Sequence, residues 1–242
     1  MRLDKLLSHS GFGSRKEVKQ LLKKSQVTVN GQQVKDGKIN VSEVADQIAV
    51  GDQLVSYQAY FYYLLHKPKG VISATEDVSH RTVLDLLAKD DYRRDLFPVG
   101  RLDKETTGLL LITNDGDFSH NLLSPKKHVS KRYAATINGV VTAEDCQRFA
   151  DGVMISGNEA CQPAQLEIIS VNLEKQTSQI KVTITEGKYH QVKRMFEAVG
   201  KQVTELHRET MGALSLDPLL TPGQYRELTT EEQTLLGLAV EK

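Results

Sequence analysis

Short apolar stretches separated by turn residues predict many strands and a few helices along this chain. Residues 109–113 read Leu-Leu-Leu-Ile-Thr and are followed by Asn-Asp-Gly, which is the pattern of a buried strand ended by a turn. Further strands are predicted at residues 62–67, 131–137, 165–170, 179–185, 203–206 and 213–216. Helices are predicted at residues 82–87, 144–149, 190–199 and from residue 230 onward. Because these elements are mixed without strict alternation, we expect an α+β fold.

The first 55 residues form a distinct pattern. Residues 3–9 place leucines on one side of a short helix, and Ser14 with Glu17 three residues later forms a capping box for a second helix. Residues 27–34 read as a hairpin around Asn30-Gly31, and residues 48–55 would complete a small sheet. We therefore predict a compact module of two helices and a small sheet, followed by a linker at residues 56–61.

Charge is distributed unevenly along the chain. The 242 residues are 39% hydrophobic, enough for one large domain or two modest ones, and the formal net charge is zero. Residues 1–24 hold seven basic and two acidic side chains, a surplus of five positive charges that the remainder must balance. On the second predicted helix Arg15, Lys19 and Lys23 recur every fourth residue. Such a row is either an ordinary solvated face or a surface that attracts nucleic-acid phosphates.

Several function classes receive no support from the sequence. Cys146 and Cys161 are the only cysteines and lack a CxxC spacing, so neither a disulfide framework nor a zinc site is indicated. We find no dinucleotide fingerprint, no phosphate-binding loop and no metal-ligand spacing, and we expect no cofactor and no metal. No secretory signal and no membrane-spanning apolar stretch is visible, so we expect a cytoplasmic protein without membrane contact.

The N-terminal module resembles a known family. Residues 2–7 (Arg-Leu-Asp-Lys-Leu-Leu), 13–16 (Gly-Ser-Arg-Lys) and 27–31 (Val-Thr-Val-Asn-Gly) are similar to the S4 RNA-binding domain. The resemblance implies an S4 domain over residues 1–58 that lays its second helix on structured RNA. Its contacts to RNA would come from the basic row Arg15, Lys19 and Lys23.

Asp103 is the first candidate for chemistry. It lies in a predicted loop between Gly100 and the apolar strand, where a scaffold can fix a carboxylate while the loop still admits a substrate. The simpler alternative is that the Asp103 carboxylate caps the local turn by bonding to Thr106 or Thr107.

Three further segments together resemble the pseudouridine synthases, in the RsuA-type branch that modifies ribosomal RNA. They are residues 100–109, with Gly-Arg-Leu-Asp and Thr-Thr-Gly-Leu, residues 131–133, Lys-Arg-Tyr, and residues 186–196, Glu-Gly-Lys-Tyr-His-Gln-Val-Lys-Arg-Met-Phe. The resemblance covers essentially the whole chain and implies a catalytic domain over residues 60–242. It also implies a reaction in which the glycosidic bond from N1 of a uridine breaks and C5 of the base is joined to the sugar.

The resemblance assigns catalytic roles to three side chains. Asp103 would act on the sugar as a nucleophile at C1′ or as a base at C2′. Lys193 would pair with it, because a neighbouring cation favours the ionised carboxylate, and Arg194 is the alternative partner. Tyr133 would stack on the flipped uracil or take the C5 proton, and the alternative for it is a tyrosine packed in the core.

Further residues would contact the RNA. Leu206 resembles the apolar wall behind the base, although by itself it reads as a core residue. Arg101 matches the residue that fills the space left by an extruded base or clamps the RNA backbone, and it could equally be an ion-pair partner of Asp103 or Glu105. Arg194 is the last of the residues that we expect to contact the RNA. His190 belongs to the family motif, and we expect it to order the loop by hydrogen bonding.

We therefore predict a monomeric enzyme that converts one uridine of 16S ribosomal RNA to pseudouridine, with an assembling small-subunit particle as its partner. Two alternatives stay open. One is an enzyme of the same branch that acts on 23S ribosomal RNA, and the other is a non-catalytic RNA-binding factor in ribosome assembly.

Overall fold

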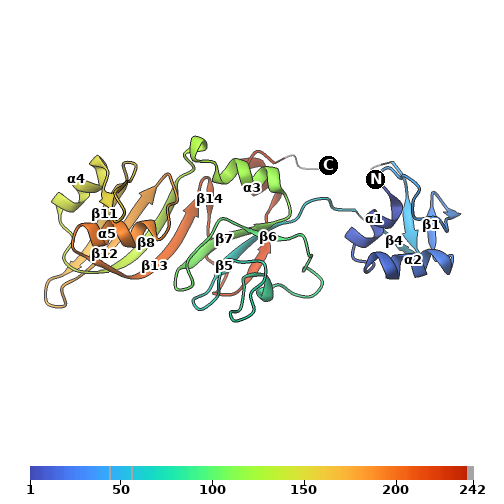
Figure 1. Cartoon of the computed structure of the whole chain (residues 1–242), viewed down its shortest axis with the longest axis horizontal. Helices are drawn as coiled ribbons and strands as arrows, with labels where there is room; N and C mark the ends of the chain where they lie inside the picture. The colour runs from blue at the N-terminus through green and yellow to red at the C-terminus, as the bar shows by residue number, and fades with distance from the viewer. Residues whose placement is uncertain (44, 56, 239–242) are drawn as a thin grey trace. The chain divides into compact units, whose positions relative to one another are not determined.

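The computed structural model describes residues 1–43, 45–55 and 57–238 (Figure 1). Their contacts divide the chain into two compact units. One is Met1–Tyr60 with Lys89–Arg93, and the other is Phe61–Ala88 with Arg94–Lys242. Residue 56 of the predicted linker, and residues 44 and 239–242 of the predicted domains, lie outside the described residues.

The first unit packs two helices on a small antiparallel sheet. Helix α1 (Leu3–His9) and helix α2 (Arg15–Lys23) precede strands β1 (Val27–Val29), β2 (Gln32–Gln33), β3 (Ile48–Val50) and β4 (Gln53–Leu54), and the strand order is β2-β1-β3-β4. The predicted capping box opens α2, with Ser14 and Glu17 bonding to each other's backbone N–H. Residues 48–55, predicted as one segment, form a hairpin instead. Gly51 allows it because its φ of 59° suits the tight turn.

The second unit is built on a nine-stranded mixed sheet. Its main path is β11-β12-β8-β13-β7-β5-β15, with β14 on β13 and β6 on β7. These strands are β5 (Tyr62–Lys67), β6 (Phe97–Val99), β7 (Thr107–Thr113), β8 (Lys131–Asn138), β11 (Gln165–Asn172), β12 (Thr177–Ile184), β13 (Gln202–Met211), β14 (Leu214–Ser215) and β15 (Tyr225–Glu227). A small hairpin joins β9 (Met154–Ile155) to β10 (Glu159–Ala160). The predicted α+β class is confirmed.

Helices cover the sheet and explain its apolar strands. Helix α4 (Ala143–Asp151) packs on β11 and helix α5 (Gln191–Ala198) on β13 (Figure 1). Along β7, Leu110 and Ile112 belong to the larger core cluster, whereas Leu109 and Leu111 belong to a second cluster with Phe118 of helix α3 (Gly116–Leu123). The run at 109–113 is continuously apolar because β7 is buried on both faces.

Some elements differ from the sequence prediction. Helix α3 follows the Asn-Asp-Gly that reads as a turn, because the Asp115 side chain accepts a hydrogen bond from the Phe118 N–H and caps the helix. The predicted helix at 82–87 is only a 3-10 turn, η1 (Leu84–Leu86), and residues 125–127 form another, η2 (Pro125–Lys127). The predicted terminal helix is α6 (Thr230–Leu235). Strand β13 runs for ten residues, well beyond the predicted 203–206.

A short parallel contact joins the two halves of the sheet. It pairs His207 with Thr107 and Arg208 with Gly108. Gly108 has a φ of 107°, and a Cβ there would lie 2.3 Å from the Arg208 carbonyl oxygen. Glycine is therefore required for the approach of β7 to β13. This approach brings the loop before β7, which carries Asp103, beside the middle of β13.

Candidate active site

The loop that carries Asp103 is fixed by the segment that follows β5. The Ser73 hydroxyl donates to the Leu102 carbonyl at 2.9 Å and accepts from the Leu102 N–H at 3.0 Å. On the other side of Asp103, the Gly70 N–H donates to the Lys104 carbonyl at 2.9 Å. These bonds hold the backbone on both sides of the carboxylate, which is how a loop residue acquires a defined position.

Lys67 lies beneath this loop and is completely buried. Its Nζ donates to the carbonyl oxygens of Pro68 at 3.0 Å, Lys104 at 3.2 Å and Thr106 at 2.9 Å. Burial lowers the pKa of Lys67 to about 8, although Glu105 and Asp103 act in the opposite direction. Three acceptors match the three N–H groups of an ammonium, so Lys67 fastens the loop from inside.

The Asp103 carboxylate faces two side chains of the segment that opens α5. Lys193 Nζ lies 3.1 Å from Oδ2, and His190 Nε2 lies 3.4 Å from Oδ1. The alternative of a capping carboxylate is not what the structure shows. The Thr106 N–H donates to the backbone carbonyl of Asp103, and the Thr107 hydroxyl bonds to the His207 ring at 2.8 Å.

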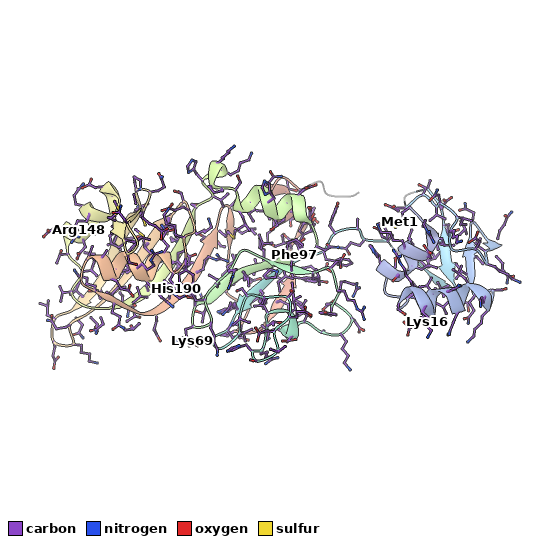
Figure 2. The ribbon with its side chains drawn as sticks, in the orientation of Figure 1. Met1, Lys16, Lys69, Phe97, Arg148 and His190 are labelled. Atoms are coloured by element: carbon purple, nitrogen blue, oxygen red, sulfur yellow. The ribbon has the colours of Figure 1, made fainter. Side chains whose placement is uncertain are left out.

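The start of α5 has an unusual backbone conformation. His190, which is labelled in Figure 2, adopts a left-handed φ of 47°. Its ring stacks on that of Tyr189 with centroids 3.8 Å apart. The Gln191 side chain accepts from the Lys188 N–H at 2.9 Å and donates to Glu186 at 2.7 Å. Gln191 thus folds the segment that places His190 beside Asp103. The role expected for His190, to order the loop by hydrogen bonding, stays a prediction.

One cavity of about 610 Å³ collects most of the predicted site residues. Asp103, Lys193, Tyr133, Leu206 and Arg101 all line it. Tyr133 and Leu206 also belong to the larger core cluster, each 7% exposed. Both residues therefore pack in the core and also line the cavity, and their contact with a target base stays a prediction.

Arg101 and Arg194 occupy different surroundings from each other. Arg101 is exposed, and within the described part of the chain it forms no ion pair with Asp103 or Glu105. Arg194 bonds to the β9–β10 hairpin, through Nε to the Ser156 hydroxyl at 3.0 Å and through Nη2 to Glu159 at 2.6 Å. It is thus Lys193, and not Arg194, that lies against Asp103. A contact between Arg194 and RNA stays a prediction.

The basic row of the first unit is accessible. Arg15, Lys19 and Lys23 are all exposed on α2, whose buried residues are Val18 and Leu22. They belong to the first unit and the cavity to the second. Any contact of this row with RNA stays a prediction.

Two buried cations in the cavity lining were missed from the sequence. Lys131 is 8% exposed and Arg208 is 2% exposed. Burial first, and then the neighbouring Arg208, lower the pKa of Lys131, while Glu186 acts against this. A signal for Lys131 was present, because residues two apart in a strand share a face and Lys131 precedes Tyr133 by two. Arg208 gave no such signal, since its burial depends on the junction of β13 with β7.

Other kinds of site find no support in the described residues. No group of three or more His, Cys, Asp or Glu side chains within residues 1–43, 45–55 and 57–238 is arranged to hold a metal ion. In the same ranges, no helix is long and apolar enough to cross a membrane.

Comparison with known proteins gives the family context of this geometry. Residues 61–198 match the family model for RNA pseudouridylate synthase, and residues 1–48 match that for the S4 domain. An uncharacterized RNA pseudouridine synthase of Bacillus subtilis, YtzG, is 49% identical over 98% of both chains. Ribosomal small subunit pseudouridine synthase A of Escherichia coli is 40% identical over 96% of this chain and 98% of its own.

Two further comparisons widen this picture. Ribosomal large subunit pseudouridine synthase B of Bacillus subtilis is also 40% identical, over 96% of this chain and 93% of its own. A crystal structure described as a pseudouridylate synthase superposes with a TM-score of 0.68 at 36% identity, covering 98% of this chain and 99% of the other.

Proposed function

This chain belongs to the RNA pseudouridylate synthase family, in the branch that carries an S4 domain, and on that premise we propose that it isomerises one uridine of 16S ribosomal RNA. The chain is a pseudouridine synthase, and its S4 domain binds RNA. The proposed substrate is 16S RNA, within an assembling small-subunit particle in the cytoplasm, and the proposed active form is a monomer.

The observation that carries this proposal is the setting of Asp103. Its carboxylate is 27% exposed, points at Lys193 and lines the same cavity as Tyr133. A carboxylate that is fixed by its loop and paired with a cation can attack C1′ or take the proton from C2′. In both routes the electron pair of the glycosidic bond leaves with N1 of the base.

The cavity wall fits a base that has left its helix. Tyr133 offers an aromatic face for the uracil and a phenol that can accept the C5 proton. Leu206 offers an apolar surface beside it, and the exposed Arg101 at the same cavity can occupy the space left in the RNA. We propose these three roles together with that of Lys193 as the partner of Asp103.

The choice between the two ribosomal subunits rests on the relatives. Small-subunit enzymes of Yersinia pestis and Escherichia coli are 42% and 40% identical to this chain, and a large-subunit enzyme of Bacillus subtilis is 40% identical. We therefore propose 16S RNA as the target and keep 23S RNA as the second candidate.

A map of pseudouridine across all ribosomal RNA tests this proposal. RNA would be compared from cells with and without the gene for this chain, and from deleted cells rescued with the wild type or with Asp103→Asn. We expect one 16S pseudouridine to disappear and to return only with the wild type. Loss of a 23S signal would move the target to the large subunit. An unchanged map would contradict the proposed substrate.

A further inference from the structure

Lys131 and Arg208 are two buried cations that line the cavity. In the described part of the chain neither forms an ion pair. Lys131 Nζ donates to the Val129 carbonyl at 3.0 Å, Arg208 Nε donates to the Leu109 carbonyl at 2.8 Å, and Arg208 Nη2 is buried without an acceptor. Burial of unpaired charge is unfavourable unless a ligand completes the site.

Glu186 is the acidic side chain whose charge acts on Lys131, but its carboxylate oxygens already bind other donors. They accept from Lys188 at 2.9 Å, from the Gln191 side chain at 2.7 Å and from the Gln162 N–H at 2.8 Å. Lys131 and Arg208 therefore keep donor capacity that no carboxylate among the described residues takes up.

The sheet register places both cations beside the proposed base-binding wall. Arg208 of β13 lies opposite Tyr133 of β8, and Lys131 lies two residues before Tyr133 on the same strand. Residues two apart share a face of a strand. Lys131, Arg208 and Tyr133 all line the cavity that also contains Asp103.

We propose that Lys131 and Arg208 bind the carbonyl oxygens of the target uracil and stabilise the negative charge that the base acquires when its glycosidic bond breaks. This inference rests on the proposed function. Preorganised donors aimed at developing charge are a strong source of catalysis in a cavity that excludes water.

The reaction balances without a further reactant. The C1′–N1 bond breaks and its electron pair stays on the uracil, where it spreads onto O2 and O4. After rotation, C5 supplies the pair that forms the C1′–C5 bond. This step displaces the Asp103 carboxylate from C1′ if Asp103 attacked there, or is accompanied by return of the proton from Asp103 to C2′ if Asp103 acted as a base. C5 then releases its proton and N1 takes one up, so the product is an isomer of the substrate. The charge on the departing base is the same whether Asp103 attacks C1′ or deprotonates C2′.

An RNA phosphate is the other source of negatively charged oxygen that could occupy this site. The two sources predict different kinetics. Stabilisation of the departing base acts on the chemical step and matters less when the base leaves more easily. Binding of a phosphate acts on the affinity for RNA, and its effect does not depend on which base is the target.

The test compares two target bases under single-turnover conditions at saturating protein. The RNA is the one in which the wild type forms pseudouridine, with the target as uridine or as 5-fluorouridine, whose electron-poor base leaves more readily. The rate of loss of the target nucleoside would be followed by chromatographic separation of the digested nucleosides with mass-spectrometric detection, for the wild type, Lys131→Met, Lys131→Arg and Arg208→Lys. Lys175→Met, at an exposed position, controls for the loss of one charge.

We expect Lys131→Met to slow the reaction of uridine by about 100-fold, to slow that of 5-fluorouridine less, and to recover in part as Lys131→Arg. A conservative Arg208→Lys keeps a cation and avoids the folding cost of an apolar replacement. Equal losses on both bases, or an unchanged rate at saturating protein for Lys131→Met, would overturn the inference while the proposed function stands. A wild type that forms no pseudouridine would overturn both.

Discussion

Replacement of Lys193 by glutamine removes the cation that lies against Asp103. The two side chains are 28% and 27% exposed, and Nζ lies 3.1 Å from Oδ2. At this separation the attraction is about 1.3 kcal/mol in water and about 5 kcal/mol in a typical protein surface environment. With a quarter of each side chain in solvent, we take a value of about 2 kcal/mol, which corresponds to a rate about 30-fold lower.

The assay for this prediction uses RNA carrying tritium at C5 of uridine, because formation of the new carbon–carbon bond releases that hydrogen. Single-turnover rates at saturating protein separate the chemical step from RNA binding. We expect Lys193→Gln to be about 30-fold slower and Lys193→Arg to lie between Lys193→Gln and the wild type.

Lys175→Gln is the matched control, since it removes one exposed positive charge from the same unit and is not part of the cavity. A wild-type rate for Lys193→Gln would refute the pairing with Asp103. An equal fall in Lys175→Gln would show that the effect comes from overall charge.

Three further predictions concern stability and RNA affinity. The pKa of Lys67 is lowered from 10.5 to about 8 in the folded protein. Between these two pH values the folded protein has released a proton that the unfolded chain keeps. Wild-type stability should therefore rise between pH 8 and 10.5 by up to about 3 kcal/mol. Urea unfolding should show no such rise in Lys67→Met. Gly108→Ala should destabilise the protein by at least about 2 kcal/mol, because its Cβ would meet the Arg208 backbone. Gly116→Ala, with open space and no positive φ, should leave the melting temperature nearly unchanged, and equal melting of the two variants would count against the close approach. The last change replaces the basic row Arg15, Lys19 and Lys23 by glutamine. It should flatten the salt dependence of RNA binding by up to about 2–3 log units per log unit of salt. An unchanged slope would show that α2 is not part of the RNA interface.

The sequence predicted the elements whose pattern is local. The capping box at Ser14 and the hairpin at Asn30-Gly31 follow from neighbouring residues alone, and both are present. The apolar run at 109–113 predicted a buried strand, although its burial on both faces depends on helix α3, which the Asn-Asp-Gly pattern concealed.

Only part of the site could be predicted from the sequence, and the reason is physical. Asp103, Tyr133 and Lys193 lie in three separate segments of the sequence. The resemblance to a known family, and not the local pattern, predicted that they lie in one site. Lys67 and Arg208 gave no signal, because a buried cation looks like a surface cation in sequence. Their burial arises from long-range contacts, the loop over Lys67 and the parallel pairing of β13 with β7.

The most direct test of the central claim is a comparison of purified wild type with Asp103→Asn. Both would be measured for tritium release from C5-labelled ribosomal RNA and for RNA affinity at one fixed salt concentration. Asparagine keeps the size of the side chain and removes its charge. We expect Asp103→Asn to bind RNA as the wild type does and to release no tritium. Substantial tritium release by Asp103→Asn would contradict the role of this carboxylate.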